Sequence, residues 1–318
     1  MEVDYEFRNW EELIPDALGL IFKNLTLDET LTVIPRVCKF WGRVVAGPYC
    51  WQEINIVEWS KCQSPQTIDR MLRMLVTRSS GLPRKLCVSG ALNDQSFSFI
   101  ADHAKSLRTL KLPRIAVSDL IVEQVAAKLS TITSLDLSYC KTVGAPALEA
   151  IGKHCKHLTK LRRCMYGWEL DKDPQDKEGF AIAATMPKLK HLELRFMRIS
   201  TEPVLQILLS CPELHLLNVV GCYSVKIDEK FVKNFSGLNV VGPEGSGWDD
   251  CSTFSVSSSY LDWDLMGVIH NEVEYDDFEE DMLDEAWEDG LGMEDGEAFG
   301  FYDSFCRDNA GFDWPPSP

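Results

Sequence analysis

Hydrophobic positions near the start of the chain follow a helical period. Leu18, Ile21, Phe22 and Leu25 have the i, i+3, i+4, i+7 spacing of one helix face. Pro15 suits the first turn of such a helix, because its missing N–H would have no partner there. The pattern predicts a short helix with one apolar stripe.

Two further short helices are expected directly after it. Asp28 is expected to cap a segment around Leu31–Ile34, and Pro35 is expected to break that segment. A third helix would then run from about Arg36 to Val45. Three helices of about 40 residues form a marginal core, so their remaining apolar surface needs a cover. A partner or the following domain could supply it.

A leucine pattern, L-x-x-L-x-L-x-x-C/N, recurs through the middle of the chain. The second leucines of successive copies are 24, 25, 26, 31, 25 and 21 residues apart, and they are Leu86, Leu110, Leu135, Leu161, Leu192, Leu217 and Leu238. Each copy begins as a short strand and continues as a helix. No copy can bury its leucines alone, so the pattern predicts an α/β solenoid of about six to seven stacked repeats, with a curved parallel sheet and the helices outside.

The longest interval contains an insert over about Met165–Glu178. Insertions in solenoids form loops on one face, often the binding face, so Trp168 is a candidate contact for a partner. A solvated connection is the alternative. Residues that alternate with the buried leucines should face the concave side, where Lys111, Arg162 and Arg195 are candidate substrate contacts. This groove, which we also expect Arg163 to flank, is mixed in charge with a basic lean.

Charge divides the chain into two unequal parts. Of 49 Asp and Glu and 32 Lys and Arg, residues 243–318 hold 22 acidic residues and one basic residue, which leaves 27 acidic and 31 basic residues before them. An acidic run with few aliphatic residues cannot form a packed core, so we expect a disordered tail over 243–318. Its interleaved aromatic residues are typical of an adhesive segment.

Composition narrows the cellular setting. Eleven cysteines occur without C-x-x-C pairs, which favours free thiols in a reducing compartment, the nucleus or the cytoplasm. The N-terminus lacks the apolar core of a signal peptide, and no apolar run approaches the ~18 residues of a membrane span. We therefore expect no membrane association.

Residues 10–52 resemble an F-box. The resemblance lies in the order of Ile14-Pro15, Ile21-Phe22, Cys38-Lys39-Phe40-Trp41 and a closing tryptophan. It implies docking onto the Skp-family adaptor of a cullin ubiquitin ligase. The implied adaptor-binding residues are Ile14, Pro15, Leu18, Ile21, Phe22, Leu25, Leu31, Val37, Cys38, Lys39, Trp41 and Trp51.

Together with leucine-rich repeats over 53–242, the N-terminal motif resembles the plant-type F-box/leucine-rich-repeat substrate receptors. The resemblance implies a non-catalytic subunit whose solenoid holds a protein for ubiquitination and proteasomal degradation. Two alternatives stay open: a ligase-independent leucine-rich-repeat scaffold, and a nucleic-acid binder, which the net charge of −17 disfavours.

Enzymatic and metal chemistry find little support in the sequence. There is no G-x-S-x-G, Walker or GxGxxG motif, and we expect no cofactor. His154, Cys155 and His157 are close in sequence, but no second pair at ligand spacing follows, so a structural cysteine is the better interpretation.

Two tryptophans directly follow glycine, namely Trp168 in the insert and Trp248 in the acidic segment. A tryptophan in a flexible polar context resembles the Gly-Trp hooks that engage pockets of Argonaute proteins. An Argonaute-type protein is therefore a candidate substrate, against a generic regulatory protein as the alternative.

Overall fold

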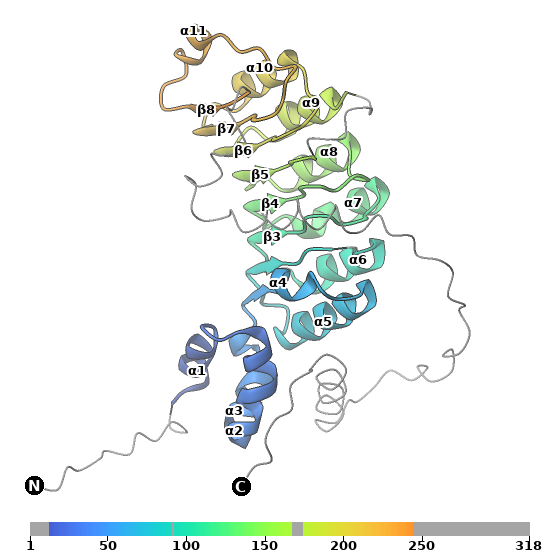
Figure 1. Ribbon diagram of the computed structural model, residues 1–318, viewed down its shortest axis with the longest axis vertical. Coiled ribbons are helices and arrows are strands. Elements are labelled where there is room, and N and C mark those ends of the chain that lie inside the picture. The colour runs from blue at the N-terminus through green and yellow to red at the C-terminus, as the bar shows by residue number, and fades with distance from the viewer. Residues whose placement is uncertain (1–12, 91, 167–173, 244–318) are drawn as a thin grey trace, which may run out of the picture. The chain divides into compact units, whose positions relative to one another are not determined.

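A computed structural model describes residues 13–90, 92–166 and 174–243 of the 318-residue chain. Within these ranges, short helices come first and a repeating strand–helix arrangement follows (Figure 1). Apart from Pro243, the predicted disordered tail lies outside the described residues. No helix in the described ranges has the length and apolarity that a membrane crossing requires.

The first helix begins where the sequence pattern placed it, whereas the third, predicted from about Arg36, begins at Lys39. Helix α1 spans Pro15–Phe22, with Pro15 in its first turn as predicted. A π-helical turn η2 (Glu29–Val33) leads into α2 (Ile34–Val37), and α3 (Lys39–Ala46) and the 3₁₀ turn η3 (Pro48–Cys50) follow.

Two predictions about this part are wrong. The Asp28 side chain does not cap the second segment; instead Thr26 and Glu29 form a reciprocal capping box, with Thr26 N donating to Glu29 Oε2 at 2.9 Å and Glu29 N to Thr26 Oγ1 at 3.2 Å. Pro35 does not break the helix, because it lies in the first turn of α2, where it costs no hydrogen bond. The break comes at Cys38, whose backbone is extended (φ −158°, ψ 162°).

Eight parallel strands form one sheet in the described residues, in sequence order from β1 to β8. Their bounds are β1 Glu53–Asn55, β2 Lys85–Cys87, β3 Thr109–Lys111, β4 Ser134–Asp136, β5 Lys160–Arg162, β6 His191–Glu193, β7 Leu216–Asn218 and β8 Asn239–Val241. The helices of this part are α4 Val57–Ser60, α5 Pro65–Arg78, α6 Asp94–His103, α7 Asp119–Val125 with the 3₁₀ turn η4 Ala126–Leu129, α8 Ala145–His154, α9 Asp176–Thr185, α10 Thr201–Ser210 and α11 Glu229–Val232. Helices α5 to α9 lie along the side of the repeats opposite the strands, whereas α11 lies at the C-terminal end (Figure 1).

The predicted leucine register is confirmed for six strands and wrong at the last. Leu86, Leu110, Leu135, Leu161, Leu192 and Leu217 are directly paired from strand to strand. In β8 the partner of Leu217 is Val240, not Leu238. The sequence pattern also missed β1, whose Ile54 pairs with Leu86 and extends the sheet by one strand.

Repeats are joined by polar contacts as well as by leucines. Asp94 at the start of α6 accepts hydrogen bonds from Ser118 N and Ser118 Oγ, both at 2.7 Å. Asp176 at the start of α9 accepts from Ser200 in the same way, at 2.6 and 2.9 Å. Cys140, Met197 and Cys222, at the last position of the leucine pattern, point inward, since each is at most 1% exposed.

Candidate functional site

The N-terminal helices expose an unusual share of apolar side chains. Seven of the twelve large hydrophobic side chains that are exposed in the described residues lie between positions 14 and 49. They are Ile14, Leu20, Ile21, Leu25, Val33, Val37 and Tyr49. Contiguous exposed apolar surface is typical of sites that bind a protein partner.

A small buried core holds these side chains in place. Leu18 and Phe22 point inward from α1, and the Phe22 ring packs on Trp41 of α3 with a centroid distance of 5.0 Å. The indole N–H of Trp51 donates to the carbonyl of Val45 at 2.7 Å, which joins the residue after η3 to α3. Trp41 Nε1 is buried and has no hydrogen-bond partner among the described residues.

One glycine allows α1 to lie close to η3. A Cβ atom added at Gly19 would lie 2.6 Å from the carbonyl oxygen of Tyr49, which is backbone and cannot yield easily. The contact presses the buried face of α1 onto the following turns, so its opposite face, with Leu20 exposed by 68%, is open.

The predicted adaptor-binding residues divide into two groups. Ile14, Ile21, Leu25, Val37 and Lys39 are exposed, and Pro15, Cys38 and Trp41 are half-buried. Leu18, Phe22, Leu31 and Trp51 are at most 5% exposed and belong to the core that supports the surface. Sequence reasoning missed Leu20 and Val33; the signal was that α1 and the segment after it carry apolar residues on more than one face. That this surface binds an adaptor stays a prediction.

On the solenoid, the side chains between the leucines form the row that the pattern predicted. Arg162 lies between two carboxylates: its Nη1 is 3.4 Å from Asp136 Oδ2, and its Nε is 3.1 Å from Glu193 Oε2, an ion pair whose N–H does not align as a hydrogen bond. Asp136 also accepts from Ser138 N and Ser138 Oγ. With 16% of its side chain exposed, Arg162 is held by its neighbours in the sheet.

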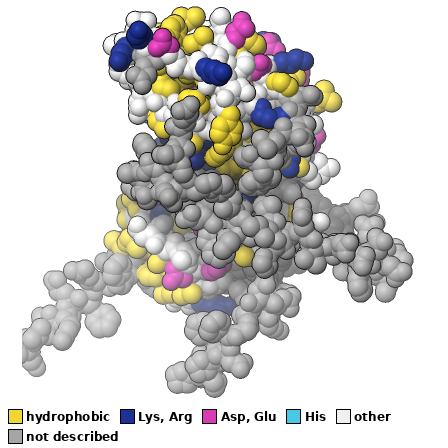
Figure 2. All heavy atoms as spheres, turned by 45° about the horizontal axis from the view of Figure 1, so that its top comes forward, with side chains coloured by type: hydrophobic (Ala, Val, Ile, Leu, Met, Phe, Trp, Pro, Cys, Tyr) yellow, Lys and Arg dark blue, Asp and Glu magenta, His cyan; other side chains and the backbone are white. Residues whose placement is uncertain are grey.

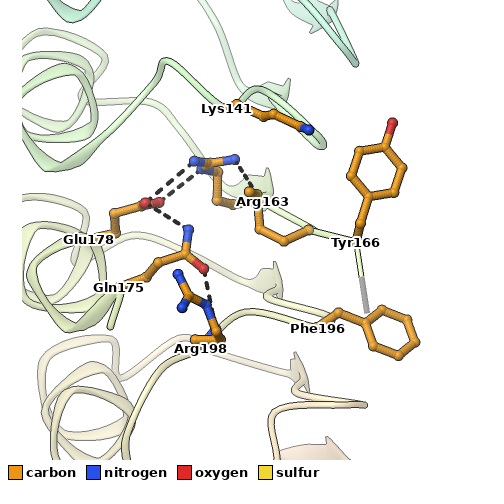
Figure 3. Close-up of a pocket in the computed structure, with 8 residues that line it drawn as sticks. Lys141, Arg163, Tyr166, Gln175, Glu178, Phe196 and Arg198 are labelled. Carbon is orange, nitrogen blue, oxygen red and sulfur yellow. Dashed lines mark hydrogen bonds and ion pairs between the residues drawn. The ribbon is translucent and has the colours of Figure 1, made fainter. Parts of the chain in front are cut away.

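Arg163 does not flank the groove, so that prediction is wrong. Its side chain is 1% exposed and occupies the inward position that Leu137 and Leu194 hold in neighbouring repeats. Arg163 Nε donates to Glu178 Oε2 at 2.9 Å, and Nη2 donates to the carbonyl of Val143 at 2.6 Å. The guanidinium is thus buried together with a carboxylate and a backbone acceptor. Figure 3 shows the contact between Arg163 and Glu178.

Glu178 and Gln175 tie down the end of the predicted insert. Gln175 Nε2 donates to Glu178 Oε1 at 3.0 Å, while Gln175 exchanges backbone and side-chain hydrogen bonds with Arg198 at 2.8 and 3.2 Å. The insert is shorter than predicted, because Met165 is buried and α9 already begins at Asp176. A cavity of about 80 Å³ lies beside this network.

The other candidate substrate contacts are partly placed. Lys111 in β3 and Arg195 after β6 are half-buried, and the Arg195 guanidinium lies 5.7 Å from the centroid of the Phe196 ring. Trp168 and Trp248 lie outside the described residues, so the Gly-Trp hypothesis stays a prediction. In Figure 2, basic, acidic and apolar side chains are interspersed over the visible C-terminal end of the solenoid.

The cysteines of the described residues are free thiols, which agrees with the sequence prediction. Cys155 Sγ donates to the carbonyl of Leu129 at 3.2 Å, and burial raises the pKa of its thiol to about 11. The described ranges contain no cluster of three or more side chains that could hold a metal ion.

Comparison with known proteins gives a consistent set of relatives from Arabidopsis thaliana. The sequence is 48% identical to the F-box protein FBW2 over the full length of both chains. It is 31% identical to the F-box protein SKIP1 over 67% of this chain and 79% of that protein. It is also 31% identical to a putative F-box/LRR-repeat protein 9, over 72% of this chain and 94% of that protein. No family model matches the sequence.

Proposed function

Because the chain belongs to the F-box/leucine-rich-repeat family, we propose that it is the substrate-recognition subunit of a Skp–cullin–F-box ubiquitin ligase. Residues 10–52 would be the F-box that docks on a Skp-family adaptor, and residues 53–242 would hold a protein substrate. The chain would contribute proximity and orientation, with ubiquitin transfer performed elsewhere in the complex.

The exposed apolar side chains of the N-terminal helices carry this proposal. Ile14, Leu20 and Ile21 are 65%, 68% and 43% exposed on α1 and the residue before it. Leaving such side chains in water is unfavourable by about 25 cal/mol for each Å² that a partner would bury. Burial of these side chains by an adaptor would favour binding by this energy, which supports a docking role.

The solenoid supports a role in holding another protein. Its short parallel strands fix the spacing of the row of polar side chains through the directly paired leucines. A rigid row of this kind pre-organises contacts and lowers the entropic cost of binding.

Copurification and reconstitution test the proposal together. The tagged full-length chain should recover the Skp-family adaptor and, through it, a cullin. Addition of ubiquitin and the conjugating enzymes should then modify proteins held by the chain. Recovery of the adaptor without any cullin would favour the ligase-independent scaffold, and recovery of neither would contradict both.

A further inference from the structure

The edge of the sheet at which the strands begin carries positive charge and no negative charge. In the six repeats from β2 to β7, the two positions before the central leucine of each strand hold five Lys or Arg, two His, four Ser or Thr and one Leu. We call these twelve residues the basic edge; they are Arg84, Lys85, Arg108, Thr109, Thr133, Ser134, Thr159, Lys160, Lys190, His191, His215 and Leu216.

The position directly after each central leucine is different. There Arg162 lies between the carboxylates of Asp136 and Glu193, so the charges of that row are mixed. Over residues 53–242 the chain has 26 Lys and Arg against 19 Asp and Glu. The basic edge contributes five cations and no carboxylate to this surplus, so positive charge is concentrated where the strands begin.

Backbone hydrogen bonds hold the basic edge in a regular row. The residue two positions before each central leucine donates its N–H to the carbonyl of its counterpart in the previous repeat, at 2.8 or 2.9 Å from Arg108 through to His215. Successive side chains are therefore one strand spacing apart, about 4.8 Å. Arg84 and Arg108 lie on adjacent repeats, as do Lys160 and Lys190, and about 10 Å separates the two pairs.

Three of the five cations are available to a ligand. Arg84, Arg108 and Lys160 are exposed, and within the described ranges none of them forms a side-chain hydrogen bond or ion pair. The other two are paired: Lys85 with Glu53, and Lys190 with Glu213 at 3.2 Å. Such exposed pairs are weak, so they offset the positive charge of the edge only in part.

Neighbouring charges act on one another at the β5–β7 end. Partial burial, and after it the positive charges of Lys160 and His215, lower the pKa of His191. A neutral His191 can still donate a hydrogen bond from its ring, while Lys160 supplies the free charge. This end can therefore bind an anion through both charge and hydrogen bonds.

Helix dipoles do not account for the basic edge. Basic residues stabilise the last turn of a helix, but the effect falls off within that turn. Arg84, Arg108 and Lys160 lie five or six residues beyond the last residues of α5, α6 and α8. Their charges therefore need another explanation.

We propose that the basic edge is the docking surface for an acidic protein segment. Its carboxylates would meet Arg84 and Arg108 at one end and Lys160 at the other, and the hydroxyl groups of Thr109 and Ser134 would face the segment between them. This inference rests on the proposed function, in that the segment would belong to the substrate.

Single-stranded nucleic acid fits the basic edge less well. Proteins that bind it provide aromatic side chains on which the bases stack, and the twelve positions hold none. Its phosphates also follow one another evenly, whereas the middle of the edge, from Thr133 to Thr159, has no cation. An acidic protein segment with two clusters of carboxylates matches this distribution.

The binding test uses the full-length chain and a fluorescent peptide in which a Gly-Ser spacer joins two glutamate clusters. Competition from the acidic residues of the chain itself is then part of the measured affinity. Wild type should bind this peptide, and bind it more weakly as salt rises, while a lysine counterpart and a single-stranded RNA oligonucleotide should bind poorly. Failure of the acidic peptide to bind, or tighter binding of the RNA, would overturn the proposal.

Reversal of one exposed charge locates the site. Arg108→Glu should weaken peptide binding about fivefold, because an attraction becomes a repulsion. Lys177→Glu, at an exposed lysine in the first turn of α9, makes a similar change in net charge and should bind like wild type. Equal losses for the two variants would contradict a local site.

A double variant tests whether the segment spans both ends. Lys160→Glu alone should also cost about fivefold, and the two reversals together about 25-fold, because sites about 10 Å apart act independently. A double variant no weaker than either single variant would contradict a segment that contacts both ends. All variants should keep the unfolding midpoint of wild type, since the substituted side chains are exposed.

Binding of the Skp-family adaptor is measured on the same samples. Peptide binding without adaptor binding would refute the proposed function alone. Adaptor binding without peptide binding would refute this inference alone.

Discussion

Between Ile14 and Tyr49, seven large apolar side chains are exposed, whereas the far longer solenoid exposes five in its described residues. The solenoid buries its leucines because each strand is covered by the next, and Leu110, Leu135 and Leu161 all have no more than 3% of their surface exposed. Within the described residues, the N-terminal helices have no such neighbour for Ile14, Leu20 or Ile21. The difference indicates that the solenoid completes its own core, and it agrees with the proposal that the N-terminal helices present a surface to a partner.

A second contrast lies inside the solenoid. Most repeats place leucine or valine at the inward position after the central leucine, but the β5 repeat places Arg163 there and neutralises it with Glu178. A core leucine needs only space, whereas a buried arginine needs a specific carboxylate. Loss of either residue alone would therefore leave the other charge buried without its partner.

The largest expected effect follows from breaking this pair on one side. Glu178→Ala leaves the Arg163 charge buried without its carboxylate, so the free energy of unfolding should fall by about 3–5 kcal/mol. Chemical denaturation measures the change. Replacing both residues by leucine, as at Leu137 and Leu194, should recover most of the loss; a double variant as unstable as Glu178→Ala would contradict the ion-pair explanation.

Replacement of an exposed apolar residue should separate binding from stability. Ile21→Glu leaves the buried face of α1 intact, so the unfolding midpoint should hold, while adaptor affinity should fall by about 2–4 kcal/mol. Leu209→Glu, at a 61% exposed position on α10, is the control. Both variants are measured for adaptor binding by surface plasmon resonance. Equal adaptor affinities of the Ile21→Glu and Leu209→Glu variants would contradict a docking surface confined to the N-terminal helices.

A smaller effect is expected from the contacts that join the repeats. Ser118→Ala removes the N-terminal cap of α7 and a hydrogen bond to Asp94, so stability should fall by about 0.5–2 kcal/mol. Adaptor affinity should not change, because the cap lies in the solenoid. A loss of adaptor binding in this variant, seen by the same assay, would argue against independent roles for the two parts.

The reactivity of the cysteine thiols compares buried with exposed positions without any substitution in the chain. Burial raises the pKa of the thiols of Cys140 and Cys155 to about 11, so they stay protonated and unreactive at neutral pH. Among the cysteines of the described residues, exposed Cys62 should react with iodoacetamide first, and mass spectrometry of the native protein would show this. Raising the pH toward the thiol pKa should increase the labelling of Cys140 and Cys155 only if the solenoid opens, because the reagent must also reach these buried thiols. Rapid labelling of Cys155 at neutral pH would contradict its burial.

Local patterns made much of the fold predictable from the sequence. The leucine period fixed the register of six strands, and the helical period with Pro15 placed α1. Predictions failed where a distant contact decided the outcome. Arg163 looks like a solvent-facing residue until the fold brings Glu178 to it, and Val240 replaces Leu238 because pairing with β7, rather than residue type, sets the last strand.

The candidate site was only half predictable for the same reason. The motif named Leu18 and Phe22 together with Ile14 and Ile21, because all four contribute to one apolar pattern. Which of them face inward depends on the packing of α1 against Trp41 and Tyr49. The helix ends at Cys38 and not at Pro35, as was predicted. A proline is tolerated in the first turn of a helix, whereas the extended backbone of Cys38 ends the helix.

Calorimetric titration of the Skp-family adaptor into the full-length chain tests the central claim most directly. Binding should be saturable with a negative heat-capacity change, because apolar surface is buried. Both signals should disappear when Ile14 and Pro15 are replaced by alanine, while the solenoid keeps its unfolding transition. Undiminished binding of the adaptor to this double variant would contradict the assignment of the N-terminal helices as the docking surface.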